Sequence, residues 1–86
     1  MNTFHLIVSS PDGNLFEGDV IKLDVRGTEG DLAVMAGHIP FVTALLEAPI
    51  TILMADDTEK KATAKGGLLT VGTDLVTLIS GSFQFE

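Results

Sequence analysis

The chain has 86 residues and a formal net charge of −7, from 5 Lys and Arg against 12 Asp and Glu. This length is too short for two domains, because single domains usually run to roughly 100 to 150 residues, so we expect one domain over residues 1–86. The absence of cysteine excludes disulfides and thiolate chemistry, and the acidic balance argues against binding to nucleic acid, which depends on clustered cations.

Strands are expected in the first half of the chain, because β-branched residues are frequent and no helical periodicity of useful length is present. Phe4–Ser9 places its apolar residues on one face, and Val20–Arg26 shows the clearest alternation of buried and exposed positions. Pro11–Asn14 separates the two as a β-turn. Gly27–Pro40 is expected to be the longest irregular stretch, with a short strand at Leu32–Val34.

The second half repeats this pattern at short intervals. Further strands are expected at Ile50–Met54, Lys61–Lys65, Leu68–Val71 and Leu75–Ile79, with turns at Asp56–Thr58 and Gly72–Asp74. The charged strand Lys61–Lys65 is expected at a sheet edge, and Phe83 and Phe85 are expected to extend the last strand over the core. Short strands divided by turns predict an all-β domain, either a sandwich or a barrel.

The hydropathy of the chain bears on membrane insertion and on partner binding. The mean hydropathy of +0.39 is high, yet the longest apolar run, Leu32 to Ala36, is too short to span a bilayer, so we expect no direct membrane insertion. The N-terminus has no basic or apolar region typical of a secretory signal, and we expect none. The apolar excess therefore indicates a dense core or an apolar surface for a partner.

Candidates for catalysis are weak. His5 and His38 have no third ligand at a spacing typical of a metal site. Ser9 or Ser10 with His38 and an aspartate could form a triad, but the G-x-S-x-G elbow is absent. Gly66-Gly67 meets neither phosphate-binding glycine pattern, and a bend between strands explains it. We expect no enzyme activity, no metal and no cofactor.

The stretch Gly27–Pro40 has acids at its start, apolar residues in its middle and a His-Ile-Pro end. Long stretches outside regular elements often carry function, although a plain crossover between two sheets would also explain this one.

Five sequence strings in the chain form a recognisable series. They are Phe4-His5-Leu6, Leu15-Phe16-Glu17-Gly18-Asp19-Val20, Gly27-Thr28-Glu29-Gly30-Asp31-Leu32, Gly37-His38-Ile39-Pro40-Phe41-Val42-Thr43-Ala44-Leu45 and Gly66-Gly67-Leu68-Leu69-Thr70-Val71. The Gly-His-x-Pro-x-x-Thr-Ala-Leu string is the specific one. By the order of these strings and the distances between them, the chain resembles the N-terminal domain of the epsilon subunit family of F-type ATP synthases, and the resemblance covers nearly the whole chain.

The resemblance implies a β-sandwich of two mostly antiparallel, five-stranded sheets. It also implies a non-catalytic rotor subunit in the central stalk, peripheral to the cytoplasmic face of a bacterial membrane, that links the gamma subunit to the c-ring. Residues that would meet gamma are Ser10, His38, Ile39 and Pro40, and residues that would meet the c-ring are Glu29 and Asp31. Most members continue into an inhibitory C-terminal helical hairpin, and we do not expect its regulatory role for residues 1–86.

Two other readings stay open. A small β-sandwich that binds a peptide or small ligand would carry its apolar surface in a concave pocket, whereas a stalk subunit would carry it as a convex patch around Ser10 and His38. An acidic hydrolase would depend on His38 for its activity.

Overall fold

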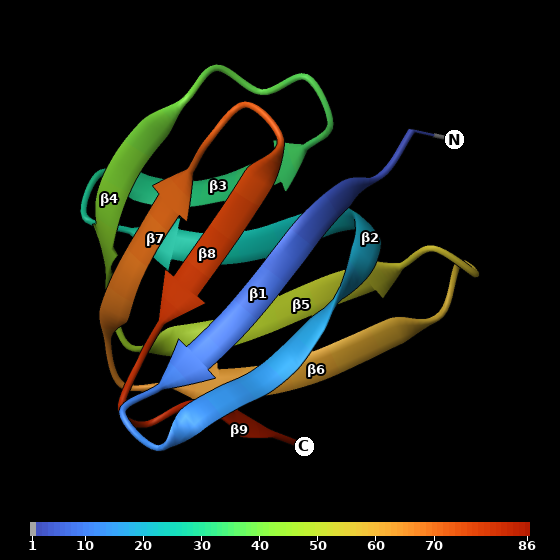
Figure 1. Ribbon diagram of the computed structural model, residues 1–86. Helices are drawn as coiled ribbons and strands as arrows, with labels where there is room; N and C mark the ends of the chain where they lie inside the picture. The colour runs from blue at the N-terminus through green and yellow to red at the C-terminus, as the bar shows by residue number, and fades with distance from the viewer. Residues whose placement is uncertain (1) are drawn as a thin grey trace.

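The computed structural model describes residues 2–86, which form nine strands and no helix (Figure 1). The all-β prediction is confirmed. The strands are β1 (Phe4–Ser10), β2 (Gly13–Gly27), β3 (Gly30–Met35), β4 (Phe41–Leu45), β5 (Ala48–Met54), β6 (Glu59–Ala64), β7 (Gly67–Val71), β8 (Leu75–Ile79) and β9 (Gln84–Phe85).

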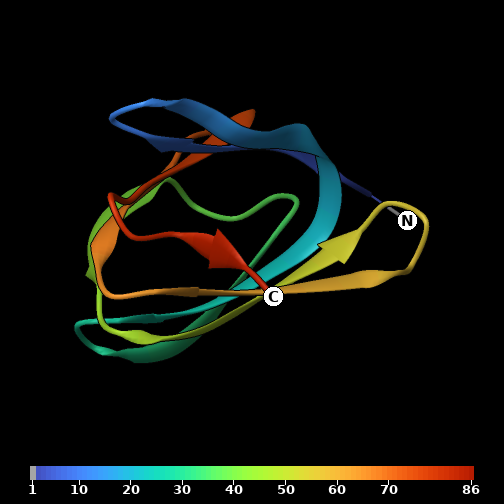
Figure 2. The ribbon, with the colours of Figure 1, turned by 90° about the horizontal axis from the view of Figure 1, so that it is seen from below.

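The strands form two layers, and the 15-residue strand β2 takes part in both (Figure 2). Sheet 1 contains β4, β7, β8, β1 and the first half of β2; sheet 2 contains β3, the second half of β2, β5, β6 and β9. A register shift between Val20 and Lys22 marks the point where β2 leaves one partner for the next. All pairings are antiparallel except β1 with β8, so the predicted two-sheet sandwich is confirmed.

Alternation along the strands builds the core between the sheets. The largest fully buried side chains come from both layers and include Leu6, Leu23, Ile52, Leu69 and Leu78. Burying one such side chain contributes about 1.5–3 kcal/mol to the free energy of folding. The core between the sheets is therefore the main source of stability in this domain without disulfides.

The stretch expected to be irregular is mostly a hairpin. Gly27 pairs with Gly30, so β2 and β3 are joined by a tight turn with Thr28 and Glu29 at its tip. Gly30 has a φ of 119°, which glycine adopts without strain. A Cβ on Gly27 would lie 3.0 Å from Thr43 Oγ1. The expectation of a long irregular stretch was therefore wrong, because Gly27 and Gly30 flank a hairpin turn; beyond that turn only residues 36–40 lie outside the strands.

Two strands differ from the expectation at sheet 1. β2 begins at Gly13 and not at Val20. The sequence pattern missed its first half because the alternation of buried and exposed residues there is out of phase with that of the second half, across the register shift. β4 had not been expected as a strand, since it is short and partly exposed; it pairs with β7 along Phe41–Leu45.

The C-terminal segment crosses from sheet 1 to sheet 2. Ser80, 2% exposed, donates a hydrogen bond to the Gly66 carbonyl, and the Lys65 amide donates to Ser82 Oγ at 2.8 Å. β9 then pairs with β6, so part of β6 is not a free edge. Phe83 covers the core as expected. The prediction that Phe83 and Phe85 extend β8 was wrong, because the chain turns away at Ser80–Ser82, where the Ser82 amide donates to Ser80 Oγ.

Candidate interaction surfaces

Most of the outer side of sheet 1 is neutral over four adjacent strands. In the pairing register Val42 lies beside Thr70, Thr70 beside Thr77, and Thr77 beside Ile7. In one flanking row Leu68 lies beside Ile79, and in the other His5 lies beside Leu75 at the border of the neutral residues. We call this surface the uncharged face. It consists of Val42 and Ala44 on β4, Leu68 and Thr70 on β7, Leu75, Thr77 and Ile79 on β8, and Ile7 and Ser9 on β1.

Apolar side chains of the uncharged face are open to solvent. Val42 is 62% exposed, and Leu68, Leu75 and Ile79 are 42–46% exposed. Single exposed apolar residues are ordinary, but a set that spans adjacent strands is typical of an interaction site. The uncharged face is therefore a candidate for the apolar partner surface, which the sequence offered as an alternative to a dense core.

The outer side of sheet 2 has the opposite character. It carries charged residues in adjacent positions, with Lys22 Nζ 3.6 Å from Asp24 Oδ2 and a second ion pair between Arg26 and Asp31. Lys61 and Glu59 continue this polar surface on β6. The two sides of the sandwich therefore suit different environments.

The predicted residues Ser10 and His38 lie at opposite ends of sheet 1. Ser10 ends β1, where its hydroxyl donates to the Gly13 carbonyl at 3.3 Å and stabilises the turn into β2. His38 precedes β4, and its ring packs against Phe41 with 4.8 Å between centroids. The uncharged face lies between them, so these two residues cannot form a catalytic triad with each other.

The loop that carries His38 also exposes Ile39 and Pro40. His38 Nδ1 lies 2.9 Å from the Ile39 carbonyl, which fits donation of the ring N–H to that oxygen, and His38 is exposed. Ile39 is 78% exposed, the highest value among the large hydrophobic residues of the described range 2–86. The loop therefore presents an apolar side chain and an imidazole at one end of the uncharged face.

Glu29 and Asp31 both lie at the tip end of the β2–β3 hairpin, Glu29 in the turn and Asp31 near the start of β3. Arg26, directly opposite Asp31 in the register, donates from Nε to Asp31 Oδ1 at 2.7 Å and from Nη2 to Oδ2 at 3.5 Å. The hydrogen bond and charge of Arg26 hold the pKa of Asp31 below its usual value. Glu29 is exposed at the turn itself.

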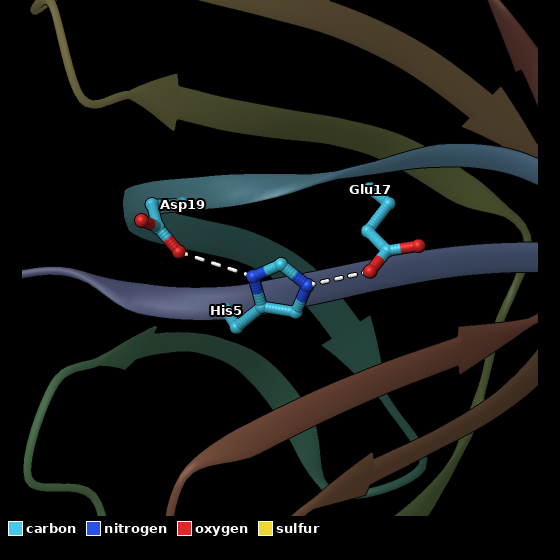
Figure 3. A network of polar contacts seen from close by, with 3 residues as sticks. All are labelled: His5, Glu17 and Asp19. Carbon is cyan, nitrogen blue, oxygen red and sulfur yellow. Dashed lines mark hydrogen bonds and ion pairs between the residues drawn. The ribbon is translucent and has the colours of Figure 1, made fainter.

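A polar cluster that the sequence did not reveal borders the uncharged face (Figure 3). His5 Nε2 lies 2.9 Å from Glu17 Oε2, and Nδ1 lies 3.1 Å from Asp19 Oδ1. These partners are 12 and 14 residues away and meet only because β1 pairs with β2 in this register. The hydrogen bonds to Glu17 and then Asp19 raise the pKa of His5, because both carboxylates favour the imidazolium.

This cluster predicts a stability that depends on pH. Because the folded-state pKa of His5 is raised above its ordinary 6.5, its stabilisation is complete below that value and is lost as the pH rises through the folded-state pKa. Urea unfolding between about pH 6 and pH 9 should show this loss in the parent chain and a smaller one in His5→Gln. Equal pH dependence in both proteins would contradict the assignment.

Two hollows are lined by residues outside the uncharged face. One of about 610 Å³ is lined by residues such as Thr63, Lys65 and Gln84, and one of about 520 Å³ by residues such as Arg26 and Ala33. The exposed apolar side chains of the uncharged face therefore do not line either of these two hollows.

Metal and membrane features can be stated for residues 2–86. Within this range no three His, Cys, Asp or Glu side chains are grouped to hold a metal ion. Nor does the range contain a helix long and apolar enough to cross a membrane.

Solved structures share this fold. A chain of the Euglena gracilis mitochondrial ATP synthase, in a structure of OSCP, F1 and c-ring, matches with a TM-score of 0.90 and 20% identity over 96% of this chain and 53% of that chain. A chain of the Tetrahymena thermophila mitochondrial ATP synthase central stalk and c-ring matches with a TM-score of 0.81 and 11% identity, covering 96% and 66%. These likenesses establish the sandwich fold.

Sequence relatives are closer. The ATP synthase epsilon chain of Wolbachia pipientis wMel is 37% identical over 84 residues, which is 98% of this chain and 74% of the relative. That of Bradyrhizobium sp. strain BTAi1 is 39% identical over 80 residues, 93% of this chain but only 58% of the relative. Residues 3–85 match the family described as ATP synthase, delta/epsilon chain, beta-sandwich domain, and the chain therefore belongs to that family.

Proposed function

We propose that this chain is a non-catalytic central-stalk subunit of an F-type ATP synthase, where it links the gamma subunit to the c-ring and transmits ion-driven rotation. The observation that carries the proposal is the presence of two chemically distinct surfaces on one sandwich. The uncharged face belongs to sheet 1, and the acidic hairpin tip belongs to sheet 2. Family membership supports the assignment.

The uncharged face would pack on gamma. The buried centre of a stable interface is depleted of charged residues, and this surface offers exposed apolar side chains among threonines and a serine. Ser10 would lie at one end of the contact, and His38, Ile39 and Pro40 at the other.

The hairpin tip would face the c-ring. Glu29 and Asp31 are exposed there, and carboxylates at such a tip suit basic side chains in the polar loops of a ring. We infer that this contact is electrostatic and weakens with salt.

The fold connects the two surfaces through a single strand. The first half of β2 pairs with β1, beside the uncharged face, and its second half ends at Gly27 in the hairpin tip. Leu46 N donates to the Arg26 carbonyl at 2.9 Å, which ties the end of β2 to the β4–β5 connection. A close-packed sandwich braced in this way deforms little, as the transmission of torque requires.

The bacterial relatives support a peripheral place on the cytoplasmic face of a bacterial membrane, within the synthase. Recovery of the tagged chain from native membranes in mild detergent tests the proposal. Gamma and c subunits should accompany it, and their joint absence, with the rest of the synthase intact, would contradict the assignment.

A further inference from the structure

The two carboxylates of the hairpin tip are not equivalent. Asp31 stands opposite Arg26 in the β2–β3 register, and both of its oxygens receive hydrogen bonds from the guanidinium, at 2.7 and 3.5 Å. Glu29 lies in the turn, two residues before Asp31, and makes no side-chain hydrogen bond or ion pair within the described residues. One acid is thus already neutralised by its own chain, and the other points outward from the tip.

The Arg26 pair is built into a braced corner of the fold. The Arg26 carbonyl accepts a hydrogen bond from Leu46 N, and the neighbouring Gly27 packs so closely against Thr43 and Leu32 that a Cβ would approach them to 3.0 Å. The guanidinium therefore starts from a fixed backbone. Its fork geometry suits a carboxylate directly across an antiparallel pair.

We propose that Arg26 is a positioning residue of the hairpin: it holds Asp31 in an internal ion pair and leaves Glu29 as the carboxylate that meets a cationic side chain of the partner. This assignment rests on the proposed contact between the hairpin tip and the c-ring. The recognised partner group is a lysine or arginine on an exposed loop, received by a single carboxylate at the end of a rigid hairpin.

The net charge of the hairpin tip distinguishes this proposal from one in which both acids bind the partner. With Arg26 in place the tip carries Glu29, Asp31 and Arg26, with a net charge of −1. Removing only the arginine frees Asp31 and doubles that negative charge. Removing the arginine and the aspartate charge together leaves the net charge and Glu29 unchanged.

The test uses an assembly of gamma and c-ring, purified in detergent from cells that lack this chain. Binding of the full chain is measured between about 50 and about 300 mM salt, because exposed charge pairs are screened over this range. Glu29→Gln should weaken binding by about threefold to fivefold at low salt and flatten its salt dependence. The double variant Arg26→Gln/Asp31→Asn should stay within about twofold of the parent.

Arg26→Gln alone gives the readout that a merely structural role would not produce. It should bind about threefold more tightly at low salt and show a steeper salt dependence, because Asp31 becomes a second available carboxylate. If Arg26 only stiffened the hairpin, the same variant would bind more weakly with an unchanged salt slope. Thermal melting of each variant confirms that it is folded.

The outcomes separate the inference from the function on which it rests. A double variant as weak as Glu29→Gln would make Asp31 a direct contact and overturn the role of Arg26, while the tip would still face the ring. If no hairpin variant changes binding to the gamma and c-ring assembly, the proposed contact of the tip is wrong and the inference falls with it. Binding of the same variants to gamma alone should equal that of the parent.

Discussion

Replacement of Thr70 by glutamate is expected to weaken binding to the gamma subunit by about 100-fold or more. Thr70 lies within the uncharged face, between Val42 on β4 and Thr77 on β8. A carboxylate introduced there would be buried without a partner, and an unpaired buried charge costs several kcal/mol. Titration of purified gamma with the variant measures the loss.

The matched control is Thr63→Glu. Thr63 is also an exposed threonine in a strand, but it faces outward from β6 on the charged side of the sandwich. Both variants should unfold at urea concentrations close to that of the parent, since both side chains lie outside the core. If Thr63→Glu lost gamma binding and Thr70→Glu kept it, the interface would lie on sheet 2.

Gly67→Ala is expected to lower the free energy of unfolding by about 1–3 kcal/mol. Gly67 begins β7 beside the end of β8, and a Cβ there would lie 2.5 Å from the Ile79 carbonyl oxygen and 3.1 Å from Ser80 Cβ. The nearer atom is backbone, so β8 or the crossing segment must move to admit a methyl group. Equilibrium unfolding in urea measures the change.

Gly81→Ala is the control for this prediction. Apart from Gly81 itself and its two chain neighbours, no heavy atom lies within 4 Å of a Cβ built on Gly81, which occupies the same crossing segment as Ser80. Its stability should match or slightly exceed that of the parent, because alanine restricts the unfolded chain more than glycine does. Equal stability of the two alanine variants would mean that β7 and β8 are less tightly apposed than described.

The alternation of apolar and polar residues was enough to predict the strands whose buried residues keep one phase. The strands around Leu6 and Ile52 follow the two-residue period, and each buries its apolar face. The same rule missed the first half of β2, because the register shift near Val20 reverses which residues face the core. A bulge depends on the partner strand and leaves little trace in local sequence.

The candidate surfaces depend on strand order, which alternation does not reveal. Val42, Leu68, Leu75 and Ile7 come from four strands and form one face only after β4, β7, β8 and β1 are placed side by side. The resemblance to a family supplied the two five-stranded sheets, whereas the individual contacts of His5 with Glu17 and Asp19 required the β1–β2 register. The Arg26 pair could have been found from sequence, had the glycines around the tip been read as a hairpin turn.

Cross-linking in the synthase recovered from native membranes is the most direct test of the central claim. The claim is that gamma and the c-ring bind to two distinct surfaces of this sandwich. A photoreactive amino acid is placed at position 70, 29 or 63, the assembly is illuminated, and the linked chains are identified by mass spectrometry. Position 70 should link to gamma and position 29 to the c subunit, while position 63 links to neither. Linkage of position 63 to gamma, with none from position 70, would contradict the account.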